Sequence, residues 1–120
     1  MKLVAIISFL ISLGIMSGTA DAKTGRCLLE VNRKIYLKGS CEVKIDPQDK
    51  ASFTIGVSDT RRSKYFAYVN IDNEGAHGFW NETPDSSYAH SSLGDLKQNG
   101  ACWENKTARV CAYKTNGLMK

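Results

Sequence analysis

Two histidines and a run of serines are the side chains in this 120-residue chain that most readily suggest catalysis. His90 lies within that run, and Asp85 and Asp95 lie on either side of it, so a serine–histidine–aspartate set can be drawn. The chain has no G-x-S-x-G turn to present the serine of such a set. A small hydrolase that uses His90 is therefore the least favoured of three functional hypotheses, the other two being binding functions described below.

Other catalytic chemistries have weaker support. Glu82 and Asp85 form a carboxylate pair of the type that cleaves glycosides, but sequence does not give the separation that this reaction needs. His77, His90 and Asp85 could bind a metal, although no helix-spaced ligand pair is present. We therefore expect a protein that is not an enzyme and that uses no catalytic residue, metal or cofactor.

The segment from residue 81 to residue 100, NETPDSSYAHSSLGDLKQNG, interrupts the rhythm of short strands. Twenty residues is long for a connection in a compact domain, and long loops are often functional. Serine, asparagine, glycine and tyrosine among carboxylates are also typical of recognition loops. The alternative is a plain connection packed by Tyr88, Leu93 and Leu96. The predicted partner-binding residues are Glu82, Asp85, Ser86, Ser87, Tyr88 and His90.

Charge is unevenly distributed along the chain. Residues 23–64 contain ten basic and five acidic side chains, and residues 97–120 contain five basic and one acidic. Residues 65–96 between them contain five acidic side chains and no lysine or arginine. An acidic face that steers a basic protein partner is one interpretation, and chance scatter of surface charge is the other. We expect no nucleic-acid binding, because basic and aromatic residues interleave only at 61–66.

Four cysteines follow residue 22: Cys27, Cys41, Cys102 and Cys111. An even number in a small exported domain indicates two disulfides, and three pairings are possible. We favour Cys27–Cys41 and Cys102–Cys111, because each pair flanks a predicted reversal of the chain. A zinc site is the alternative, but spacings of 14 and 9 residues do not match the usual ligand patterns.

The dominant hydrophobic period is two, which predicts β-strands. Turn signals at residues 32–34, 38–39, 46–49, 72–75 and 105–106 separate the strand-like segments. The only helical candidate is 88–98, as a short helix or a loop. We expect one all-β domain over residues 23–120, a small antiparallel barrel or sandwich of seven to eight strands joined by two disulfides. The expected strands are 29–31, 35–37, 40–45, 51–57, 65–71, 76–80, 101–104 and 107–113.

The first 22 residues have the pattern of a secretory signal peptide. Lys2 precedes an apolar run over 3–16, and Ala20-Asp21-Ala22 offers small residues for cleavage after Ala22. A membrane anchor is the alternative, but the run is shorter than the roughly 20 residues of a bilayer span. We therefore expect a periplasmic protein that does not insert into the membrane once the signal peptide is cleaved.

A small exported all-β domain with disulfides and a Ser/Tyr-bearing loop resembles the periplasmic inhibitors of c-type lysozyme. The resemblance implies an antiparallel barrel whose protruding loop enters the lysozyme cleft and occupies its catalytic carboxylates. The family's loop motif is of the kind Ser-Gly-x-x-Tyr, whereas residues 85–88 read Asp-Ser-Ser-Tyr, without the glycine and with a shorter spacing. Only Ser86, Ser87 and Tyr88 carry over. The second hypothesis is an interaction module for another envelope or host protein.

Overall fold

The computed structural model describes residues 23–58 and 61–114, and within these ranges every regular element is a β-strand. The strands are β1 (Lys23–Val31), β2 (Lys34–Ile45), β3 (Phe53–Val57), β4 (Arg62–Asp72), β5 (Gly75–Trp80), β6 (Ser91–Asn99), β7 (Cys102–Glu104) and β8 (Ala108–Lys114). Each strand pairs with the next in antiparallel fashion, and β8 pairs with β1 to close an eight-stranded barrel. The predicted all-β fold is confirmed. The predicted signal peptide lies outside the described residues.

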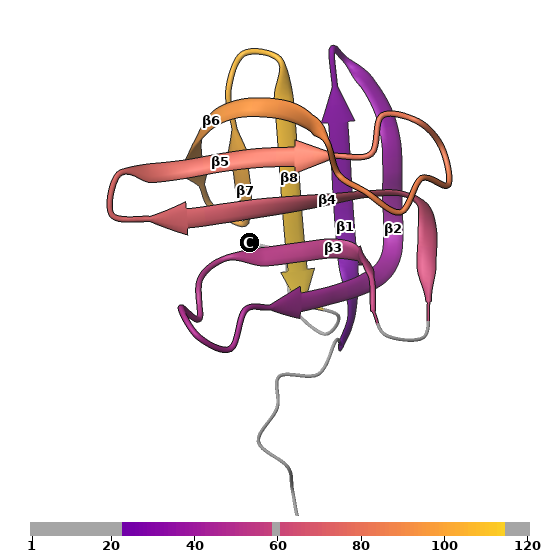
Figure 1. Cartoon of the computed structure of the whole chain (residues 1–120), viewed down its shortest axis with the longest axis horizontal. Helices are drawn as coiled ribbons and strands as arrows, with labels where there is room; N and C mark the ends of the chain where they lie inside the picture. Colours follow the sequence, from indigo (N-terminus) through magenta and orange to yellow (C-terminus); the bar gives the residue numbers. More distant parts are fainter. Residues whose placement is uncertain (1–22, 59–60, 115–120) are drawn as a thin grey trace, which may run out of the picture.

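The barrel is flattened into two crossed groups of strands. Strands β3, β4 and β5 run across the direction of β1 and β8, and the long, bent strand β2 passes from one group to the other (Figure 1). None of the residues that the structure describes belongs to a helix long and apolar enough to cross a membrane.

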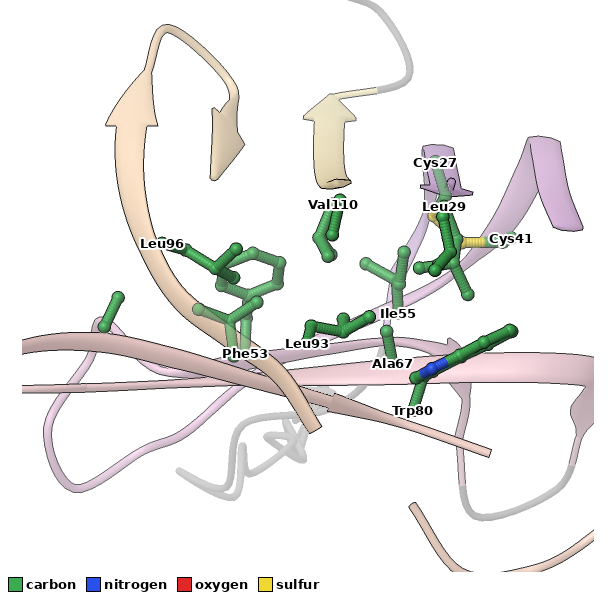
Figure 2. Close-up of a cluster of buried hydrophobic side chains, with 14 residues drawn as sticks. Cys27, Leu29, Cys41, Phe53, Ile55, Ala67, Trp80, Leu93, Leu96 and Val110 are labelled. Atoms are coloured by element: carbon green, nitrogen blue, oxygen red, sulfur yellow. A yellow bond between two sulfur atoms is a disulfide. The ribbon is translucent and has the colours of Figure 1, made fainter. Parts of the chain in front are cut away.

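Buried apolar side chains alternate with more exposed ones along the strands, and the buried set builds the core. Leu29, Ile55, Val69 and Val110 are fully buried and come from β1, β3, β4 and β8. Leu29, Ile55 and Val110 converge in the space between the two groups of strands (Figure 2). Burying each such side chain contributes about 1.5–3 kcal/mol, so these four residues are a substantial part of the core's stabilising effect.

The two predicted disulfides are confirmed. Cys102 and Cys111 are register partners on β7 and β8. Cys27 is bonded to Cys41 on the neighbouring strand, two positions beyond its register partner Gly39. Two disulfides in a small domain are consistent with an exported protein, because oxidising compartments preserve such bonds.

One predicted turn is wrong. Residues 38–39 do not reverse the chain but lie inside β2, which continues from Lys34 to Ile45. Gly39 has a φ of +110°, a conformation that glycine adopts without steric cost. The glycine therefore allows a long strand to bend rather than end.

The helical candidate at 88–98 is also wrong, since most of it forms β6. Leu93 and Leu96 are both buried although they are three residues apart, a spacing typical of a helix. The register explains this: Gly78 pairs with Gly94 and Phe79 with Ser92, so Leu93 is an extra residue in a β-bulge. The bulge turns both leucines inward. The predicted 20-residue loop is consequently a connection of ten residues, 81–90, followed by a strand.

Candidate functional site

The connection between β5 and β6, named here the 81–90 loop, is fixed at its start by a buried asparagine. Asn81 is only 1% exposed. Its Oδ1 accepts a hydrogen bond from the Phe66 backbone N–H at 2.7 Å. Its Nδ2 donates to the carbonyl oxygens of Lys64 at 3.0 Å, Ser86 at 3.1 Å and Thr83 at 3.4 Å. One side chain thus joins the loop to itself and to β4.

The backbone of the 81–90 loop adds further restraints. The N–H of Asp85 donates to the Lys64 carbonyl at 2.9 Å, and the N–H of Ser86 donates to the Thr83 carbonyl at 3.1 Å. Asp85 has a φ of +64°, a left-handed conformation that aspartate tolerates better than most residues. The Ser86 Oγ accepts a hydrogen bond from the Tyr88 N–H at 3.3 Å. The loop therefore holds a defined shape up to its tyrosine.

Tyr88 is the most exposed of the large hydrophobic side chains that the structure describes, at 67% of its accessible area. Its ring lies 5.3 Å from the His90 ring, at an interplanar angle of 53°. Leu93 and Leu96, which the alternative interpretation packed with Tyr88 in a plain connection, lie on β6 and belong to the core. The tyrosine is therefore presented to solvent.

The other predicted site residues surround this tyrosine. Glu82, Asp85, Ser87 and His90 are exposed, and Ser86 is half-buried. The Glu82 Oε1 accepts a hydrogen bond from the Ser91 hydroxyl at 3.2 Å. A cavity of about 210 Å³ lies between the foot of the loop and its tip. The cavity is lined by Asn81, Glu82, Thr83, Ser86, Tyr88, His90 and Ser91.

The acidic part of the chain does not form a single face. Glu82 and Asp85 lie in the 81–90 loop, after the end of β5, whereas Asp72 and Glu74 lie at the hairpin before its start. The six residues of β5 separate these ends by about 20 Å at the usual rise of a strand. The negative charge that a partner of the loop would meet is therefore that of Glu82 and Asp85.

The two histidines lie in different surroundings. The His77 Nδ1 is 2.7 Å from the Asp95 Oδ1, its register partner on β6, whereas the neighbour of His90 is the ring of Tyr88. Within the described ranges, no serine hydroxyl is hydrogen-bonded to either histidine. No three His, Cys, Asp or Glu side chains of these ranges are grouped as metal ligands would be.

Sequence reasoning missed two features that matter here. Asn81 was not expected to organise the loop, and the pairing of His77 with Asp95 depends on a strand register that the bulge shifts.

The fold and the site together define a small disulfide-linked β-barrel that presents one well-fixed polar loop with an exposed tyrosine. Comparison with models of protein families, with curated proteins and with solved structures gave no match.

Proposed function

We propose that this barrel is a periplasmic protein that inhibits c-type lysozyme by inserting the 81–90 loop into the active-site cleft. The observation that carries the proposal is the combination of a buried, fully hydrogen-bonded foot at Asn81 with a 67% exposed side chain at Tyr88. A loop that is already ordered loses little conformational entropy on binding. A rigid aromatic side chain among small polar groups suits insertion into a concave partner.

The chemistry at the tip suits an acidic cleft. Ser87 and Tyr88 present hydroxyl groups, which can donate hydrogen bonds to carboxylates. The cleft of c-type lysozyme contains two catalytic carboxylates that such donors could meet. Glu82 and Asp85 would instead lie at the rim, where negative charge attracts the basic surface of the enzyme.

The proposal includes export. Residues 1–22 would act as a signal peptide that is removed after Ala22, and the two disulfides support an oxidising compartment. Expression of the full chain in a Gram-negative host, followed by N-terminal sequencing of the periplasmic product, tests this part. The expected first residue is Lys23. Retention of Met1 in a membrane fraction would overturn the assignment of a cleaved signal.

Inhibition is tested with purified, oxidised residues 23–120 in an assay of cell-wall lysis by c-type lysozyme. We expect inhibition at micromolar concentration and its loss in Tyr88→Ala, because a central aromatic side chain contributes roughly 2 kcal/mol or more to binding. Ile45→Ala is the matched control, since Ile45 is an exposed hydrophobic residue on β2, outside the loop. Unchanged lysis at micromolar excess of the wild-type protein would refute the proposal.

A second candidate is recognition of a different basic protein through the same loop. It is favoured by the sequence at 85–88, which lacks the glycine of the inhibitor motif while keeping the exposed tyrosine, and by the two carboxylates of Glu82 and Asp85 in the same loop. Affinity capture with wild-type and Tyr88→Ala baits separates the two candidates. A protein other than lysozyme that only the wild-type bait retains would support this second function.

A further inference from the structure

We propose that the barrel carries a second binding site, for an oligosaccharide, at the end of β5 opposite the 81–90 loop. A cavity of about 540 Å³ lies there, between the β4–β5 hairpin and the β7–β8 turn. Small-molecule sites usually have volumes of roughly 300–1,000 Å³. Ala76 and Leu96, register partners on β5 and β6, are among the lining residues, and their almost fully buried side chains anchor this wall to the core.

The walls of this cavity are held in place by hydrogen bonds. The Asn105 Nδ2 in the β7–β8 turn donates to the carbonyl oxygens of Leu93 at 2.8 Å and Asp95 at 2.9 Å on β6. At the opposite wall, the Glu74 N–H donates to the Asp72 Oδ1 at 2.8 Å and closes the hairpin turn. The cavity is therefore preformed, which lowers the conformational cost of binding.

The polar groups around the cavity favour a neutral ligand with many hydroxyls. The contact of 2.7 Å between the His77 Nδ1 and the Asp95 Oδ1 orients the imidazole. Its Nε2 has no hydrogen-bond partner among the described residues, so it can meet a ligand. Glu74 and Asp95 provide acceptors, and Lys97 and Lys106 provide donors. A third carboxylate, Glu104, also lines the cavity, but its Oε1 is paired with the Arg109 Nε at 3.1 Å. The other two negative and two positive charges balance, so a strongly charged ligand gains little, whereas sugar hydroxyls can bond to both kinds of group.

The outer face of the sheet beside the cavity adds aromatic rings and further polar groups that could contact a sugar. Tyr68 and Phe79 are register partners on β4 and β5, and both rings are partly exposed. The next pair on this face is Asn70 with His77, and the Tyr68 hydroxyl donates to the Asn70 Oδ1 at 3.2 Å. Sugar rings offer C–H groups to the negative faces of aromatic rings and hydroxyls to neighbouring polar groups. Two aromatic rings next to the polar row favour a ligand of more than one sugar unit.

The test is a titration of oxidised residues 23–120 with chitotriose, cellotriose and maltotriose, followed by the backbone amide signals in NMR spectra. We expect at least one of the three sugars to give saturable shifts at 74–79, 95–97 and 104–106 at concentrations up to about 10 mM. His77→Ala and Phe79→Ala should each weaken this binding at least tenfold. Tyr88→Ala is the matched control, because its ring belongs to the 81–90 loop, and it should bind the sugar as the wild type does.

Absence of shifts with all three sugars would overturn the proposal, and so would shifts confined to residues 81–90. Unchanged affinity in His77→Ala would also overturn it. Asp95→Asn supplies a second variant with a nearly identical shape, and we expect it to bind at least threefold more weakly. The lysozyme assay does not involve this site, so failure of one proposal leaves the other standing.

Discussion

The contribution of Asn81 can be worked out from its surroundings. Replacing it with alanine removes four side-chain hydrogen bonds at a position that is 1% exposed. The Phe66 N–H then lies buried without a partner, which costs about 1–3 kcal/mol. The carbonyl oxygens that Nδ2 had bonded are closer to solvent and can be rehydrated in part. We therefore expect Asn81→Ala to lower the free energy of unfolding by about 3 kcal/mol in total.

The assay is thermal and urea unfolding of oxidised residues 23–120. For a domain of this size, about 3 kcal/mol corresponds to a fall in Tm of roughly 10–20 °C. Asn73→Ala is the matched control, because Asn73 is exposed in the β4–β5 turn, and its change should stay within about 0.5 kcal/mol. Asn81→Asp tests the donor alone: it keeps an acceptor for Phe66 but turns a carboxylate oxygen toward three carbonyl groups. We expect it to destabilise at least as much as alanine. Wild-type stability in either Asn81 variant would refute this account of the loop.

Three further predictions follow from charge and covalent structure. Glu82→Lys with Asp85→Lys should slow association with lysozyme most at low salt, measured by stopped-flow or surface binding, because both carboxylates are exposed. Reduction of both disulfides, which span 14 and 9 residues, should lower the free energy of unfolding by about 3 kcal/mol each in the chain-entropy model, measured by urea titration with and without reductant. The Ser52 hydroxyl, and then the backbone N–H groups of Ala51 and Ser52, hold the pKa of Asp49 below its ordinary value of 3.8. The ionised Asp49 carboxylate therefore stabilises the fold fully at neutral pH, and this stabilisation is lost only as the pH falls below 3.8 and through the lowered pKa of the folded state. NMR titration of the Asp49 carboxyl in the wild type and in Ser52→Ala measures the pKa, which should rise in the variant.

Most of the fold follows from local patterns in the sequence. Strand alternation and turn residues place seven of the strands near their observed positions, and the cysteine spacings agree with the observed disulfides. The errors occur at glycines. Gly39 bends β2 where a turn was expected, and the bulge beside Gly94 gives Leu93 and Leu96 a helical spacing on a strand. Both departures depend on pairing with a neighbouring strand, which a local pattern does not contain.

The site could be predicted only in part. The residues of the 81–90 loop were identified by composition, but the order of the loop depends on Asn81, which sequence shows as the first residue of an Asn-Glu-Thr glycosylation motif. Asn105 begins a second such motif and also connects neighbouring segments, with its Oδ1 accepting from the N–H groups of Thr107 and Ala108 at 2.8 Å each. An asparagine followed by turn residues has the same sequence pattern whether it is a glycosylation motif or a structural residue whose side chain bonds to the backbone. Only the positions of distant backbone groups, such as the Phe66 N–H, distinguish them.

The structure separates the part of the barrel that provides stability from the part that presents a surface. The disulfides join β1 to β2 and β7 to β8, whereas the 81–90 loop is held by β4 through Asn81 and by the pairing of β5 with β6. Substitutions at the tip of the loop can therefore change recognition without touching either disulfide or the buried row of the core. If the loop binds lysozyme as proposed, its foot is already fixed before binding, so variation at Ser87 and Tyr88 should act mainly on dissociation. This arrangement allows one stable barrel to present different recognition chemistry through a change of a few exposed residues.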